Sequence, residues 1–379
     1  MLSKFRIVTI FTVVAIIIVT IVIGVSRNSR NTLPPVFDHD LGNHPLYQTY
    51  EFGEDSSVLD IGTQPLFFPT GLITEVLQRD QIYKDALREI GIEVRFHPFL
   101  KGRDVNHFLA EGKLEAGIGG DAPTLSAIAK LNVVAPVIVQ RGFLSIVADR
   151  PMLVEDLRGK RIGYARGSNA HYALLAALKH RDLLEDDVNL IPMDITQMTI
   201  ALEQKIVDAF SAWGPEPAEA LNTHPDFVTI HQYIGTGFMY FSEAVENSHP
   251  DALPHTVAAV IRAVTWLRIS NKNLYLAADW MRTISYELSG KPLSLSNIQI
   301  AALAEKELIG LFSLPELPAA DLEPDGSLQQ EYEFLVELGS IPDGVPWERV
   351  RDGFREDIMA TVLKSPDQFR LDEYSYDLD

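Results

Sequence analysis

The chain has 379 residues, of which 46% are hydrophobic and 22% are charged, and its formal net charge is −20. This length is sufficient for two ordinary domains, and the composition is that of a globular protein. The sequence contains no cysteine, which excludes a disulfide framework, a thiolate metal site and a cysteine nucleophile. A nucleic-acid partner is not expected, because phosphate binding requires clustered Lys and Arg.

The N-terminal region contains a long apolar run. Residues 7–25 are 19 positions without a charge, with two basic residues close to each end. A bilayer span needs about 20 residues, whereas the core of a cleavable signal has about 7–15. The run favours an uncleaved signal-anchor within residues 1–30, and a long cleavable signal is the alternative. Both predict an extracytoplasmic location, in the periplasm or at the cell surface, anchored to the cytoplasmic membrane or released after cleavage.

A polar linker with prolines is expected over 31–57, and beyond it apolar runs alternate with helical patterns. The first unit has predicted strands at 58–62, 92–99, 114–120, 133–140 and 143–149, and helices at 70–91, 104–112 and 122–130. The second has predicted strands at 160–165, 189–194, 207–213 and 227–234, and helices at 169–183 and 195–206. After about Gly235 the pattern is almost wholly helical, at 251–270, 272–288 and 294–309. This alternation predicts an α/β architecture with largely parallel strands.

The helical region after the second unit indicates that the chain returns to the first. We expect lobe 1 to comprise 58–142 and 238–312, and lobe 2 to comprise 143–237. Two crossings between two α/β lobes create a hinge and a cleft. An acidic C-terminal extension is expected over 313–379, since residues 301–379 hold 19 acidic and 6 basic side chains. It is interpreted as surface helices that keep the chain soluble or dock on a partner.

A glycine loop with a basic residue precedes the helix predicted at 169–183. A helix N-terminus leaves about four N–H groups unpaired and carries partial positive charge. The glycine permits close approach to a ligand, the serine or asparagine caps the helix or contacts the ligand, and the arginine adds a full charge. This arrangement suits a sulfonate, phosphate or carboxylate, and an ordinary N-cap is the alternative. The candidate residues are Arg166, Gly167, Ser168, Asn169 and His171.

Three other predicted strand ends carry candidate ligand residues. The loop after the strand at 114–120 has a glycine pair, an aspartate and then a proline in the first helical turn. The first strand is followed by a glutamine and phenylalanines, and the strand at 207–213 ends in a tryptophan that would roof a cleft. Ligands of open α/β sheets bind beyond the carboxyl ends of the strands. The alternatives are simple helix capping for the glycine loop and burial in the core for the aromatic side chains. The candidates are Gln64, Phe67, Gly120, Asp121, Ala122 and Trp213.

Over residues 58 to about 310, these segments in their order and spacing resemble the periplasmic binding proteins of ABC importers for sulfonates, taurine and nitrate. The matching residues are Leu157, Gly159, Lys160, Arg166, Gly167, Ser168, Asn169, His171, Val207, Asp208, Ala209, Trp213 and Pro215. The segment at 111–129, with Glu115 in its first acidic place, resembles a further motif of that family. The resemblance implies a two-lobed type II periplasmic binding protein fold, in which each lobe is a mixed, mostly parallel sheet flanked by helices. It also implies an ABC permease in the membrane as partner.

We therefore expect the extracytoplasmic solute-binding component of an ABC-type importer, without catalysis, cofactor or metal. It would be a monomer that captures a small anionic or zwitterionic ligand, such as a sulfonate, taurine or nitrate, by hinge closure. Gly214 stands where the family carries an acidic residue, which weakens the case for a ligand amine such as that of taurine. Two alternatives stay open. A related branch of the family implies a thiamin-precursor (pyrimidine) binding or biosynthetic protein, and the N-terminal run keeps a membrane-tethered ligand sensor in view.

Overall fold

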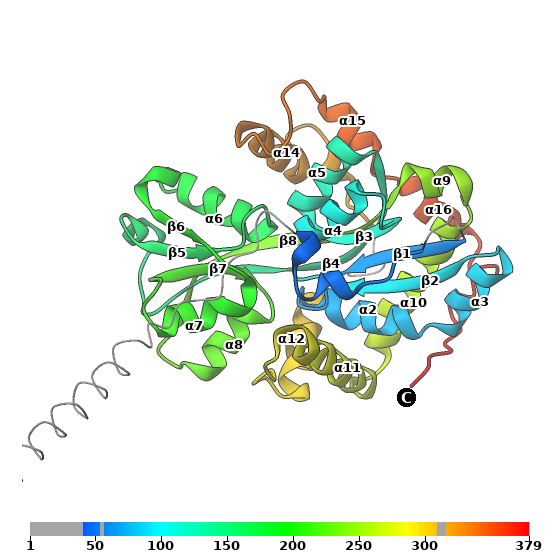
Figure 1. Ribbon diagram of the computed structural model, residues 1–379, viewed down its shortest axis with the longest axis horizontal. Coiled ribbons are helices and arrows are strands. Elements are labelled where there is room, and N and C mark those ends of the chain that lie inside the picture. Colours follow the sequence, from blue (N-terminus) through cyan, green and yellow to red (C-terminus); the bar gives the residue numbers. More distant parts are fainter. Residues whose placement is uncertain (1–40, 54–56, 309–315, 379) are drawn as a thin grey trace, which may run out of the picture. The chain divides into compact units, whose positions relative to one another are not determined.

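The strands of the described residues assemble into one mixed sheet of eight (Figure 1). The computed structural model describes residues 41–53, 57–308 and 316–378. The strands are β1 (Val58–Thr63), β2 (Glu93–Pro98), β3 (Ala116–Gly120), β4 (Val133–Ala148), β5 (Arg161–Tyr164), β6 (Asn189–Pro192), β7 (Ala209–Trp213) and β8 (Val228–Ser242). Their spatial order is β2-β1-β3-β8-β4-β7-β5-β6. The pairs β1–β2, β1–β3, β5–β6 and β5–β7 are parallel, whereas β4 and β8 run antiparallel to their neighbours.

Strands β4 and β8 are long, with 16 and 15 residues, and pair with each other. The last residues of β8 also pair with β3, and the last residues of β4 pair with β7. These two strands therefore connect two halves of the sheet. We call the half built on β1, β2 and β3 lobe 1, and the half built on β5, β6 and β7 lobe 2.

Two sequence predictions about these strands are wrong. The sequence predicts a break after residue 140 and helical structure after Gly235, but both strands continue through these positions. Gly142 and Gly235 lie opposite each other in the antiparallel pair. A methyl group built on Gly235 would lie 2.9 Å from Leu144 Cδ1. Glycine here permits close packing within a strand and does not mark a turn.

Helices cover both lobes. Lobe 1 carries α2 (Thr70–Arg79), α3 (Gln81–Glu89), α4 (Gly102–Ala110), α5 (Asp121–Leu131), α9 (Glu243–Ser248), α10 (Ala252–Ile269), α11 (Asn271–Ser289) and α12 (Asn297–Leu308). Lobe 2 carries α6 (Asn169–Lys179), α7 (Met198–Glu203) and α8 (Glu216–Thr223). In the part of the chain that the structure describes, no helix is both long and apolar enough to cross a membrane. The apolar run at 7–25 and much of the linker predicted at 31–57 lie outside the described residues.

The single helix predicted over 70–91 is in fact two helices, divided at Asp80. The Asp80 carboxylate caps α3 by accepting a hydrogen bond from Tyr83 N at 3.0 Å. It also pairs with Arg262 of α10 at 2.7 Å, with both side chains at most 2% exposed. Arg262 Nη1 donates to the carbonyl of Phe369 at 2.7 Å. A buried ion pair therefore holds α3, α10 and the end of the chain together.

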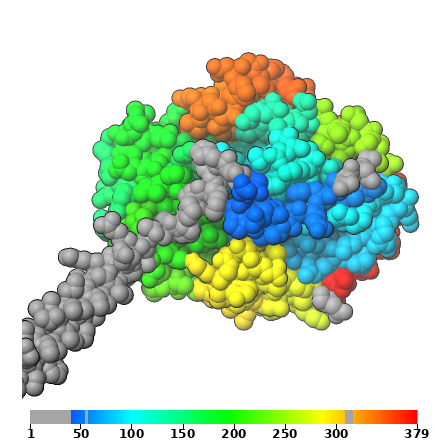
Figure 2. All heavy atoms as spheres, viewed as in Figure 1, coloured from blue at the N-terminus to red at the C-terminus, as the bar shows by residue number. Residues whose placement is uncertain are grey.

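Residues 316–378, which we call the C-terminal segment, form α13 (Ala319–Leu322), α14 (Ser327–Glu337), α15 (Trp347–Asp352) and α16 (Glu356–Lys364). Ala135 of β4 donates its N–H to the carbonyl of Gly353 at 2.8 Å and accepts from Arg355 N at 3.1 Å. The segment is thus fixed to lobe 1 beyond α14. In Figure 2 the orange part of this segment, with α14 and α15, lies against the teal of α5.

Candidate functional site

The loops that follow β1 and β7 meet across the two lobes. Trp213 Nε1, at the end of β7, donates to the carbonyl of Leu66 in lobe 1 at 2.9 Å. The backbone N–H of Phe68 donates to the carbonyl of Gly214 at the same distance, 2.9 Å. Lobe 1 and lobe 2 are therefore in direct contact at the strand ends where the sequence predicts ligand residues.

Gly120 and Asn169 form a second close contact between the lobes. A methyl group built on Gly120 would lie 2.5 Å from Asn169 Nδ2, closer than real contacts allow. Asn169 is 4% exposed, and its Oδ1 accepts from Ala170 N at 3.0 Å. Its Nδ2 is buried without a hydrogen-bond partner among the described residues. The two predicted ligand loops thus pack against each other.

The predicted aromatic walls are buried at the same contact. Phe67 and Trp213 meet edge to face with ring centroids 6.3 Å apart, and neither side chain is more than 3% exposed. Gln64 donates from Nε2 to the carbonyl of Ile118, which ties the end of β1 to β3. These three side chains lie in the packing between strand ends, and among the described residues they line neither of the two cavities below.

Asp121, the first residue of α5, satisfies backbone groups of the protein itself. Its Oδ2 accepts from Thr236 N at 2.9 Å and its Oδ1 from Ala122 N at 3.1 Å. Burial raises the pKa of Asp121 to about 6. Glu331 of α14 is hydrogen-bonded to this carboxyl group. Burial and the Asp121 charge raise the pKa of Glu331 well above its usual range.

A cavity of about 620 Å³ lies beside this contact, between α4 and α5 of lobe 1 and the loop that precedes α6 in lobe 2. Gly167 in that loop has a φ of +72°, which favours glycine. Ser168 caps α6, since its Oγ accepts from His171 N at 3.2 Å. The N-terminus of an 11-residue helix is therefore presented to the cavity. Of the predicted residues, those that line the cavity are Ala122, Arg166, Gly167, Ser168 and His171.

The cavity is positively charged. Arg103, Lys130 and Arg166 line it, together with one carboxylate, Glu185. Burial and the Arg103 charge lower the pKa of Lys130. Burial and the Arg166 charge lower the pKa of His171 to about 4, so this imidazole is neutral at pH 7. The positive charges of these side chains repel one another, and an anion bound among them would be stabilised by attraction to all of them.

Several cavity residues were missed by the sequence prediction. They are Arg103, Asn106 and His107 of α4 and Lys130 of α5. Arg103 lies against the glycine loop, because a methyl group on Gly167 would be 3.2 Å from Arg103 Cδ. These residues follow no loop motif, and only the packing of α4 and α5 against lobe 2 brings them to the cavity.

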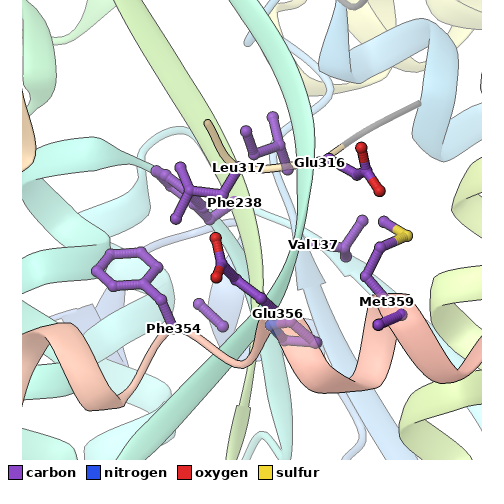
Figure 3. A pocket seen from close by; sticks show the side chains of 11 residues that line it. Val137, Phe238, Glu316, Leu317, Phe354, Glu356 and Met359 are labelled. Carbon is purple, nitrogen blue, oxygen red and sulfur yellow. The ribbon is translucent and has the colours of Figure 1, made fainter. Parts of the chain in front are cut away.

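A second cavity of about 260 Å³ has the opposite charge. It is lined by apolar side chains of β4, β8 and α16, and by the carboxylates of Glu316 and Glu356 (Figure 3). Phe238, Phe354 and Met359 form its apolar wall. Two carboxylates disfavour an anionic ligand here. The cationic cavity is therefore the candidate site.

Residues 83–266 match the NMT1/THI5-like family. The taurine-binding periplasmic protein of Escherichia coli (strain K12) is 28% identical over 289 residues, which cover 71% of this chain and 84% of the relative. The alkanesulfonate-binding protein SsuA from Xanthomonas axonopodis pv. citri, solved with MOPS bound, is similar with a TM-score of 0.57 and 19% identity, over 77% of this chain and 96% of that one. The desulfurization enzyme DszB has a TM-score of 0.53 and 16% identity, over 81% and 99%. The predicted resemblance and fold are confirmed: residues 83–266 match the NMT1/THI5-like family model, and the chain has the periplasmic binding protein fold.

Proposed function

We propose that this chain is an extracytoplasmic binding protein that captures a small organic anion of the sulfonate class. The charge of the cavity carries the proposal: Arg103, Lys130 and Arg166 gather there in a protein whose net charge is −20. Burial lowers the pKa of Lys130 and of His171, and the neighbouring arginine charges lower both further. A sulfonate offers three oxygens to these cations and to the N-terminus of α6. The taurine- and alkanesulfonate-binding proteins reported above support this head-group chemistry.

Ligand capture would proceed by hinge closure. In this proposal lobe 1 is 58–142 with 238–312, lobe 2 is 143–237, and β4 and β8 bend where they pass between the lobes. The closed arrangement is supported by the pair of Lys101 in lobe 1 with Asp194 in lobe 2, whose Nζ and Oδ1 are 3.5 Å apart. A ligand that contacts both lobes only when they are closed shifts the population toward that state.

The wider role follows from the relatives and the N-terminal run. The apolar residues 7–25 would either anchor the chain to the cytoplasmic membrane or direct its export, which places the cavity outside the cytoplasm. An ABC permease would then receive the ligand from the closed, monomeric binding protein. We propose no catalytic step. His171, with a pKa of about 4, is too weak a base for general-base chemistry near pH 7 and suits a hydrogen-bond role.

The test is a thermal-shift screen of the full chain against alkanesulfonates, taurine, nitrate, carboxylates and thiamin-type pyrimidines. A ligand at about 100 times its Kd stabilises a protein by about 2.7 kcal/mol. Arg166→Gln should weaken sulfonate binding by at least about tenfold, because a full charge–charge hydrogen bond is worth more than about 1.4 kcal/mol. Arg158→Gln is the matched control, since Arg158 is an exposed lobe 2 arginine paired with Asp187 outside the cavity.

The panel also separates the alternatives. A shift with pyrimidines alone would replace the proposal by thiamin-precursor handling. If none of the compounds shifted the melting temperature, the result would favour a membrane-tethered ligand sensor and contradict solute capture. Equal losses of sulfonate affinity in Arg166→Gln and Arg158→Gln would show that general surface charge, and not the cavity, attracts the anion.

A further inference from the structure

Helix α14 belongs to the C-terminal segment and lies outside residues 83–266, the range of the family match. It nevertheless contacts the candidate site. On the lobe 1 side, Lys130 Nζ donates to the carbonyl of Ser340, just beyond α14, at 2.7 Å. Glu331 of α14 is fully buried against the N-terminus of α5, where it meets Asp121. Polar contacts therefore hold both ends of this helix region to α5.

The same helix also contacts lobe 2. Phe334 packs against the hydrophobic core of lobe 2, and its ring centroid is 5.1 Å from that of Tyr172 at an interplanar angle of 73°. Glu337 accepts a charge-assisted hydrogen bond from Lys179 of α6 at 3.0 Å. Helix α14 is thus positioned by both lobes, and its side chains have a defined place over the boundary between them.

Between these two sets of contacts, α14 and the residues after it form one wall of the cationic cavity. The lining residues from this region are Leu335, Leu338, Gly339 and Ser340. Leu335 and Leu338 are three positions apart, so they lie on one face of the helical turn. Leu335 is 5% exposed, whereas Leu338 is 36% exposed. The cavity therefore combines cations from α4, α5 and the α6 loop with an apolar wall from the C-terminal segment.

We propose that α14 is the specificity element of this cavity, and that Leu338 and Leu335 receive the hydrocarbon body of the bound organic anion. The inference rests on the proposed function and adds to it a preference for ligands with a hydrocarbon body. The ligand is an amphiphilic anion whose head group meets Arg103, Lys130 and Arg166, and whose apolar part lies on the two leucines. Small anions without a hydrocarbon body would gain nothing from this wall.

The test compares methane-, butane- and hexanesulfonate by isothermal titration on the full chain, and each sulfonate titrated into the same buffer without protein is the blank. Each methylene buried on the leucine wall should improve the affinity by about fourfold. Leu338→Ser places a hydroxyl on the wall at a partly exposed position, so the fold is retained. It should weaken hexanesulfonate by at least about tenfold and methanesulfonate by less than about twofold. The matched control is Leu153→Ser, at a leucine that is 67% exposed and lies outside the cavity.

Two failures are distinguishable. If the unaltered chain binds the whole series with one affinity, or if Leu338→Ser weakens all three ligands alike, the specificity role of α14 is overturned while solute capture stands. If the unaltered chain binds none of the sulfonates, the proposed function itself is overturned, and the inference with it.

Discussion

Adding one methyl group at Gly120 should act as a wedge between the lobes. In Gly120→Ala the new methyl would lie 2.5 Å from Asn169 Nδ2 and 2.7 Å from Asn169 Cγ. Ordinary contacts between heavy atoms are about 3.5–4.0 Å, so Asn169 must retreat by about 1 Å. Gly120 has φ −66° and ψ 177°, which alanine adopts without strain. The whole penalty therefore comes from the contact with lobe 2.

The size of the effect follows from packing. Overfilling a well-packed contact costs about 1–3 kcal/mol, and Asn169 is 4% exposed, with little room to move. If the ligand binds only the closed lobes, its affinity should fall by about 5- to 160-fold. Isothermal titration with the most stabilising sulfonate of the panel measures this. Circular dichroism confirms that the variant is folded.

A second substitution separates the wedge from a direct ligand contact. Asn169→Ala removes Nδ2 and Cγ, the two atoms nearest the new methyl, and leaves only Cβ at 3.1 Å, so the double variant should bind nearly as tightly as Asn169→Ala alone. If Gly120→Ala binds like the unaltered chain, the lobes do not close through this contact. If the double variant stays as weak as Gly120→Ala, the methyl blocks the ligand and not lobe closure.

Three other substitutions test the structure. Lys101→Met leaves Asp194 without its cross-lobe partner, and because truncating a nearly buried pair costs about 2–5 kcal/mol, ligand affinity in titration should fall at least about tenfold. Asp80→Asn leaves the buried Arg262 charge poorly compensated, and urea denaturation should show a loss of about 3–5 kcal/mol. Glu331→Gln should reduce the pH dependence of the melting temperature: the pKa of Glu331 is raised in the folded chain, so this carboxyl contributes stability below its unfolded pKa that is lost as the pH rises. The melting temperature of the unaltered chain minus that of the variant should therefore decrease above about pH 4.5.

Each of these has a contrary result. Unchanged affinity in the lysine variant would mean that the ion pair stabilises the open and closed lobe arrangements equally. A loss below about 1 kcal/mol in Asp80→Asn would mean that solvent reaches the arginine. A constant difference in melting temperature between pH 4 and 8 would mean that the pKa of Glu331 is the same in the folded and unfolded chain.

The sequence predicted the loop of the site better than the cavity around it. The order of strand end, glycine and capping serine is local, so Gly167 and Ser168 could be recognised from spacing alone, and the structure places both at the cavity. Arg103 and Lys130 could not be found in this way, because each reaches the cavity through the packing of a whole helix. Trp213 was predicted as the roof of a cleft, but it lies in the contact between lobes, and its role as a ligand residue stays a prediction.

The fold shows the same division between local and distant information. The strands at 58–62 and 207–213 were predicted with nearly correct bounds, because their apolar runs are short and bounded by turn residues. The continuation of β8 beyond Gly235 was missed, since its pairing partners in β3 and β4 lie about a hundred residues earlier in the chain. Likewise, surface helices were predicted over 313–379, but the burial of Glu331 could not be predicted, because it depends on Asp121 of a distant helix.

The attachment of α14 to both lobes has a consequence for the rate of ligand exchange. Any motion that separates α6 from α5 must also separate Phe334 from Tyr172 or break the contacts of α14 with lobe 1. Opening of the lobes then has an activation barrier to which the C-terminal segment contributes, in addition to the energy needed to bend β4 and β8. A bound molecule would leave slowly even where its equilibrium affinity is modest. Residence time and affinity would then be set by different parts of the chain.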